Sequence, residues 1–150
     1  MVRKYIIDSL CYWASEYHID GFRFDLMGVL DIETLNEARK ALLKINPDII
    51  MYGEGWTGGE STLPESERGM KINAPRTPGI GMFSDDIRDA VKGHVFYMDE
   101  LGFVNGAADR GEELKQAVTC AKWAKSPMQS INYLSCHDNY TLWDRFIISN

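Results

Sequence analysis

The stretch His18-Ile19-Asp20-Gly21-Phe22-Arg23-Phe24-Asp25 decides how this chain folds. Its last four residues alternate apolar and polar side chains, which is the pattern of a β-strand. Immediately upstream, apolar residues recur every three or four positions over residues 3–17 and predict an amphipathic helix. The expected buried face of that helix consists of Ile6, Leu10, Trp13 or Ala14, and Tyr17. A helix that leads into a strand is the unit from which α/β folds are built.

The alternation of helices and strands continues downstream. A helix is expected to begin at Asp31, as its N-cap, and to end at Pro47. Its apolar face is Leu35, Ala38, Leu42 and Ile45. Further strands are expected at 49–52, 80–83 and 130–134, further helices at 84–92, 111–124 and 139–147, and loops at 57–78 and 94–110. This order predicts parallel βα units and an α/β fold.

Three acidic residues lie at or just beyond the ends of expected strands: Asp25, Glu54 and Asp138. The carboxyl ends of parallel strands share one edge of a sheet, and in a closed (β/α)8 barrel the active site lies on that face. Residues far apart in the sequence can therefore meet there.

Arg23 and Asp25 are two positions apart on one strand, so both point to the same side of the sheet. A buried charge is costly unless it is paired, so we expect the guanidinium to hold the Asp25 carboxylate ionised and oriented. A fixed, ionised carboxylate can act as a nucleophile. The alternative is an ion pair that only satisfies the interior.

Glu54 lies between Gly53 and Gly55, which allow the backbone and a ligand to approach closely. Tyr52 and Trp56 add aromatic surface suited to packing on sugar rings. This setting favours a general acid. The alternative is an ordinary glutamate on a surface loop.

His137, Asp138 and Asn139 follow the expected strand at 130–134. Asp138 can accept hydrogen bonds from sugar hydroxyls, and His137 can donate them. The alternative is a turn in which Asp138 or Asn139 caps the next helix. Taken together, the three acids supply the two carboxylates that glycoside hydrolysis requires, and a third that can stabilise a distorted sugar.

These residues carry a resemblance to the α-amylase family, glycoside hydrolase family 13. Residues 20–25 resemble the nucleophile block of the family, residues 52–56 its acid/base block, and residues 132–139 its third carboxylate block. The resemblance implies that Asp25 is the nucleophile and Glu54 the general acid/base. It implies that Asp138 stabilises the transition state, that Arg23 orients Asp25, and that His137 contacts the sugar. Tyr52, Trp56 and Asn139 are the remaining candidate substrate-binding residues.

Finer features are similar to the type I pullulanase subgroup: Leu26-Met27-Gly28, Trp56-Thr57-Gly58-Gly59 and residues 83–89. That similarity implies a retaining α-glucan debranching glycosidase that hydrolyses α-1,6 links in pullulan, starch or glycogen. Three alternatives stay open: an isoamylase or glycogen-debranching enzyme, an α-1,4-cleaving amylase, and a non-catalytic glucan-binding barrel remnant.

One block of the family, an Asp four residues ahead of an Asn-His pair, has no counterpart in this sequence. A complete (β/α)8 barrel also needs about 250 residues. We therefore expect residues 1–150 to form part of one catalytic barrel domain, about strands four to seven, as an internal fragment of a longer enzyme. We expect this fragment alone to be inactive.

The composition excludes some partners and leaves others open. The net charge of −6 argues against a nucleic-acid partner, and no apolar run is long enough for a membrane span. Three cysteines without a metal-binding spacing favour reduced thiols, mostly buried, and a cytoplasmic rather than secreted protein. The expected hydrolysis requires no cofactor; calcium is compatible with the sequence, although no calcium or other metal site is identified.

Overall fold

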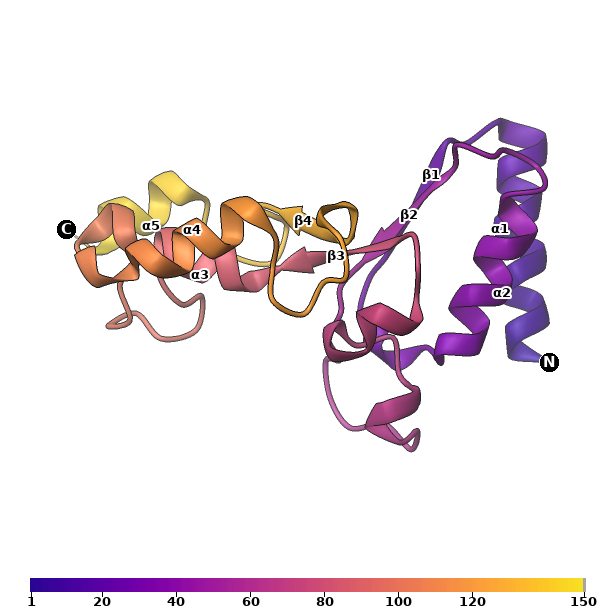
Figure 1. Cartoon of the computed structure of the whole chain (residues 1–150), viewed down its shortest axis with the longest axis horizontal. Helices are drawn as coiled ribbons and strands as arrows, with labels where there is room; N and C mark the ends of the chain where they lie inside the picture. The colour runs from indigo at the N-terminus through magenta and orange to yellow at the C-terminus, as the bar shows by residue number, and fades with distance from the viewer. Residues whose placement is uncertain (150) are drawn as a thin grey trace. The chain divides into compact units, whose positions relative to one another are not determined.

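A computed structural model describes residues 1–149 and divides into two compact units, residues 1–82 and residues 83 onward. Strands β1 (Gly21–Phe24), β2 (Ile50–Gly53), β3 (Ile80–Ser84) and β4 (Ser130–Asn132) form one sheet in the order β1-β2-β3-β4 (Figure 1). The pairs β1–β2 and β2–β3 are parallel. Helices and long loops connect these strands, so the predicted α/β class is confirmed.

The register of the first two strands determines which side chains meet beyond their ends. Arg23 lies opposite Tyr52, and Phe24 lies opposite Gly53. The pairing continues past β2, because the backbone N–H of Glu54 donates to the carbonyl of Phe24 at 2.9 Å. Asp25 and Glu54 therefore leave the sheet side by side.

Helices α1 (Val2–Tyr17) and α2 (Ile32–Leu42) lie side by side in the first unit (Figure 1). Asp31 is the N-cap of α2, as predicted, and its carboxylate accepts from the backbone N–H of Thr34 at 2.8 Å. Arg3 on α1 reaches the same carboxylate at 3.0 Å and ties the two helices together. The core of this unit includes Met27, Leu35, Ala38, Leu42, Met51, Ile80 and Met82.

Two details of these helices differ from expectation. Ala14 is the buried residue of α1, whereas Trp13 and Tyr17 are exposed and pack against each other. α2 ends at Leu42, before Ile45, because its carbonyl accepts from the N–H of Ile45 three residues ahead in a tighter turn. Periodicity alone could not separate that last tight turn from the helix.

The segment between β2 and β3 is loop-like, as predicted, with two short 3-10 turns, Glu65–Glu67 and Lys71–Arg76. The 3-10 turn Lys71–Arg76 begins beside Gly55, because the N–H of Lys71 donates to the carbonyl of Gly55 at 2.9 Å.

The second unit is built around α3 (Asp85–Lys92), which contacts α4 (Gly111–Thr119) and α5 (Leu142–Ser149) (Figure 1). Gly93 ends α3 with a φ of 86°, a conformation that favours glycine. Short 3-10 turns follow at Phe103–Asn105, Ala108–Arg110 and Pro127–Gln129. Arg145 of α5 is 2% exposed and donates to the carbonyls of Lys92, Tyr97, Met98 and Glu100.

Three boundaries of the second unit also differ from expectation. α4 ends at Thr119 rather than at residue 124, and the Thr119 hydroxyl bonds back to the carbonyls of Lys115 and Gln116. β4 ends at Asn132, two residues early. Ser84 precedes α3 as predicted, but its side chain makes no capping hydrogen bond.

Among residues 1–149, no helix is both long and apolar enough to span a membrane. The three cysteines are free and half-buried, so the expected reduced thiols agree with the structure but the expected burial is only partial.

Candidate active site

Arg23 joins the two acidic residues that follow β1 and β2. Its guanidinium Nη2 lies 2.7 Å from Glu54 Oε1 and 3.3 Å from Asp25 Oδ1. The expected Arg23–Asp25 contact is therefore present. The sequence did not predict that the same guanidinium would lie closer to Glu54.

Glu54 is enclosed by the protein. The residue is 2% exposed, and its second oxygen, Oε2, accepts from the backbone N–H of Leu26 at 2.8 Å. The alternative of a glutamate on a surface loop is wrong. A buried carboxylate is tolerated here because one oxygen meets a cation and the other a backbone donor.

The carboxylates of Asp25 and Glu54 lie close together. An oxygen of one lies within 4.8 Å of an oxygen of the other. The Asp25 side chain is 62% exposed, whereas the Glu54 side chain is 3% exposed. One carboxylate is thus open to a ligand from solvent, and the other lies behind it, fixed by hydrogen bonds.

The glycines around Glu54 are required by the neighbouring backbone. A Cβ atom on Gly53 would lie 2.4 Å from the carbonyl oxygen of Phe24, and one on Gly28 would lie 2.5 Å from the carbonyl oxygen of Trp56. The Gly28 N–H donates to that Trp56 carbonyl at 3.1 Å. The loop that carries Glu54 is therefore held by main-chain contacts on both sides.

Leu26, directly after Asp25, has a φ of 43° and a ψ of 48°, which is the left-handed region. Such a backbone costs a residue other than glycine of order 1–3 kcal/mol and is concentrated at functional sites. In this conformation the backbone N–H of Leu26 donates a hydrogen bond to Glu54 Oε2. Sequence reasoning missed this donor, because nothing in a leucine codes for positive φ.

The two aromatic candidates lie on β2 and on the loop that follows it. Tyr52 is on β2, opposite Arg23, and Trp56 follows Gly55; both residues are half-buried. Their partial exposure leaves aromatic surface beside the carboxylates, and their substrate-binding role stays a prediction.

In the second unit, His137 and Asp138 lie on the turn between β4 and α5. Their side chains are 52% and 54% exposed, and His137 Nε2 lies 2.8 Å from Asp138 Oδ1. α5 begins at Leu142, and Thr141 supplies the hydroxyl that accepts from the Asp144 N–H at the start of that helix. The alternative in which Asp138 or Asn139 caps the helix is therefore wrong.

Asn139 is engaged within the protein. Its Nδ2 donates to the carbonyl of Val95 at 3.1 Å, and its Oδ1 accepts from the N–H of Tyr140 at 2.7 Å. These bonds fix the turn beside Asp138. They supply a reason for an asparagine at this place in addition to the predicted contact with substrate.

One group of possible metal ligands lies within the second unit. Cys136, His137 and Asp138 have donor atoms within 4.8 Å of one another. The three residues are consecutive, and adjacency alone brings their side chains together, so this spacing does not identify a metal site.

The chain was compared with known proteins. It is 41% identical to a pullulanase of Bacillus subtilis over 97% of its own length and 21% of the relative. It matches the crystal structure of an Anoxybacillus pullulanase complexed with maltotetraose with a TM-score of 0.95 and 46% identity, over 99% of this chain and 22% of that one. It is also 30% identical to a glycogen operon protein GlgX homolog of Mycobacterium bovis, over 93% of this chain and 19% of the relative.

The chain spans about a fifth of the length of these relatives. No family model matches it. Its parallel sheet and helices correspond to a portion of the pullulanase fold, which agrees with the predicted part of a (β/α)8 barrel.

Proposed function

Since the chain belongs to the type I pullulanases of the α-amylase family over the segment that it spans, we propose that it supplies the catalytic carboxylates of a debranching glycosidase. The substrate is an α-glucan with α-1,6 links, such as pullulan or branched starch or glycogen. The proposal concerns the longer protein in which this segment would work. The segment alone is expected to be inactive, because a partial barrel leaves open sheet edges and an incomplete site.

The proposed reaction proceeds in two steps. Glu54 protonates the glycosidic oxygen while Asp25 attacks the anomeric carbon, so the C–O bond to the leaving glucan breaks as an ester to Asp25 forms. Glu54 then removes a proton from water, which attacks the same carbon and releases Asp25 as a carboxylate. Two inversions leave the product in the α configuration.

The positions of the two carboxylates carry this proposal. Retaining glycosidases hold their carboxyl groups about 5–5.5 Å apart, whereas inverting enzymes leave about 6.5–9.5 Å for a water molecule. The oxygen-to-oxygen approach of Asp25 and Glu54, within 4.8 Å, supports the retaining arrangement. The exposure of Asp25 suits a group that must reach substrate, and the enclosure of Glu54 suits one that must hold its direction.

The other residues have supporting roles in this proposal. Arg23 orients both carboxylates and balances their charge. Asp138 stabilises the transition state, and His137, with its exposed ring, contacts a sugar hydroxyl. Tyr52 and Trp56 pack against sugar rings, and Asn139 assists from the Asp138 turn.

The test is Asp25→Asn in the full-length protein, with pullulan as substrate. Loss of the nucleophile should lower kcat by at least about 10³-fold. Asp48→Asn is the matched control, because Asp48 is exposed and precedes β2 at its other end, and this variant should keep full activity. Turnover that survives in Asp25→Asn would overturn the assignment of Asp25 as the nucleophile, and a wild-type protein that binds pullulan without cleaving it would favour the non-catalytic glucan-binding alternative.

A glycogen-debranching activity is the second candidate. The similarity to the GlgX homolog, whose name places it in a glycogen operon, favours it. The products formed from pullulan separate the candidates: maltotriose supports a pullulanase, whereas panose or an intact polymer points to an α-1,4-cleaving amylase or an isoamylase-type enzyme.

The proposed chemistry uses only protein carboxylates and water, so it requires no cofactor; calcium stays compatible with it. The odd number of cysteines supports a cytoplasmic location as part of the same proposal.

A further inference from the structure

The turn that carries Asp138 has no regular secondary structure of its own, because it lies between the end of β4 at Asn132 and the start of α5 at Leu142. The carboxylate itself is 54% exposed. Its position therefore depends on how the turn is fastened to the rest of the second unit.

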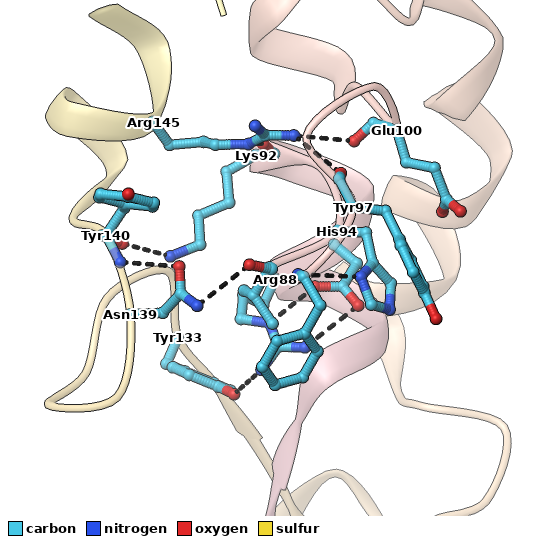
Figure 2. Close-up of polar contacts among 12 residues, drawn as sticks. Arg88, Lys92, His94, Tyr97, Glu100, Tyr133, Asn139, Tyr140 and Arg145 are labelled. Atoms are coloured by element: carbon cyan, nitrogen blue, oxygen red, sulfur yellow. Dashed lines mark hydrogen bonds and ion pairs between the residues drawn. The ribbon is translucent and has the colours of Figure 1, made fainter. Parts of the chain in front are cut away.

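Helix α3 fastens this turn on both sides of Asp138. Before it, Arg88 Nη1 donates to the hydroxyl of Tyr133 at 2.8 Å. After it, Lys92 Nζ donates to the carbonyl of Tyr140 at 2.7 Å. Arg88 and Lys92 are four residues apart and share a face of α3, and Figure 2 shows them reaching Tyr133 and Tyr140, respectively.

Lys92 is an unusual residue for this task. It is 2% exposed, and its ammonium donates to a carbonyl oxygen. The guanidinium groups of Arg88 and Arg145 lie near enough to add, after burial itself, to the lowering of the Lys92 pKa. The Asp89 carboxylate acts in the opposite direction, but the net change of the Lys92 pKa is downward. A buried cation is costly, and an apolar side chain of the same length would avoid that cost.

The placement of Lys92 explains why this cost is tolerated. The Tyr140 carbonyl lies two residues beyond Asp138, and the intervening Asn139 is bonded to the Val95 carbonyl and to the Tyr140 N–H. The carbonyl of Lys92 accepts from Arg145 Nε at 3.3 Å and from Asn105 Nδ2 at 3.3 Å, so the backbone of Lys92 is fixed. A fixed donor thus sets the position of the turn.

We infer that Lys92 is a positioning residue, which holds the Asp138 turn so that the carboxylate is set for the reaction. This inference rests on the proposed function. Catalytic groups are sensitive to small displacements, and a shift of 1 Å can cost on the order of 10²-fold in rate. Loss of the Lys92 bond should therefore act on the chemical step through Asp138.

The test is Lys92→Met in the full-length enzyme, which removes the ammonium and keeps an apolar stem. We expect kcat on pullulan to fall about 10-fold or more with KM little changed, since the lost interaction concerns the transition state. Lys92→Arg, which keeps a donor of similar reach, should recover much of that loss. Lys115→Met is the control, because Lys115 is 74% exposed on α4, and it should leave kcat unchanged.

A second comparison separates positioning from simple stabilisation. If Lys92 acts through Asp138, Lys92→Met should lower kcat little further in an Asp138→Asn background. Backbone hydrogen exchange should also rise over 135–141 and stay the same over α4. Equal losses in both backgrounds, or unchanged exchange in the turn, would overturn the inference. Lys92→Gln, judged by the same measurements, replaces the methionine variant if that variant does not fold.

The outcomes also distinguish this inference from the proposed function. If Asp138→Asn keeps full turnover, the proposed function fails, and with it any role of Lys92 in it. If Asp138→Asn loses turnover while Lys92→Met retains the wild-type kcat, only the role of Lys92 is refuted.

Discussion

The two units hold their acidic residues by different means. In the first, Glu54 is enclosed, with Arg23 on one oxygen and the Leu26 N–H on the other. In the second, the Asp138 side chain is half-exposed and paired with His137, while bonds from α3 hold the turn beneath it. Direct contacts to both oxygens fix the first carboxylate, whereas the second depends on hydrogen bonds to the turn that carries it. Removing the charged or polar partner of each acidic residue should therefore change stability unequally in the two units.

The largest expected effect tests the charge network of the first unit. Arg23→Leu leaves the buried Glu54 carboxylate without its cation, and the free energy of unfolding should fall by about 3 kcal/mol, the low end for such losses because the Leu26 N–H remains. His137→Ala removes the corresponding partner of Asp138, and there the change should stay within about 0.5 kcal/mol, since both groups are exposed. Urea denaturation of both variants measures the contrast.

A further substitution checks the cause of that loss. Glu54→Gln removes the buried charge and keeps most of the shape, so it should restore part of the stability of Arg23→Leu. If the double variant is as unstable as the sum of the two single variants, the loss comes from packing of the arginine stem and not from the unpaired carboxylate.

The next effect concerns the backbone contacts of the Glu54 loop. Gly28→Ala places a methyl group 2.5 Å from the Trp56 carbonyl oxygen. The Met70 side chain at 2.6 Å can move aside, but this main-chain oxygen cannot, so the change should cost about 2 kcal/mol. Gly59→Ala, on the loop that follows β2, is the control, because nothing lies within 4 Å of its Cβ position, and its cost should be near zero. Thermal or urea unfolding measures the stability of both variants. Equal stability would mean that the backbone around Gly28 relaxes freely.

The smallest expected effect is the pH dependence of stability that Tyr133 causes in the second unit. Burial is the main cause that raises the pKa of Tyr133 to about 12 from 10.0. Between these values the folded state holds the phenol proton more tightly than the unfolded state does. The stabilisation is complete below pH 10.0 and is lost as the pH rises, by at most about 1.4 kcal/mol per pH unit.

Tyr133→Phe removes this titration. The stability advantage of the wild type over the variant should therefore be smaller at about pH 11 than at about pH 9, as measured by urea unfolding at each pH. The Lys92 pKa is lowered, so Lys92 acts in the opposite direction, with stability rising as the pH approaches 10.5. Because both proteins retain Lys92, the difference between them isolates Tyr133. A constant advantage would mean that Tyr133 titrates alike in the folded and unfolded states.

The sequence by itself determined most of the helices and strands, and it predicted where the candidate site lies. Alternation at residues 22–25 and the apolar run at 49–52 predicted β1 and β2, and the acids after them predicted where chemistry would gather. These features are local: a strand or helix is encoded by the spacing of its own apolar residues, and strand ends in a parallel sheet share one edge. The helix ends at Leu42 and Thr119 were missed because turns, not periodicity, set them.

Only the tertiary structure decided how the acidic residues are held. The parallel register of β1 and β2 brings Glu54 closer than Asp25 to the Arg23 guanidinium, although Asp25 is nearer in sequence. The left-handed backbone of Leu26 and the bond from Lys92 to the Tyr140 carbonyl likewise depend on segments that are distant in the chain. A residue's type fixes what it can donate or accept, but its partner is chosen by packing, because hydrogen bonds and ion pairs act only over a few ångströms.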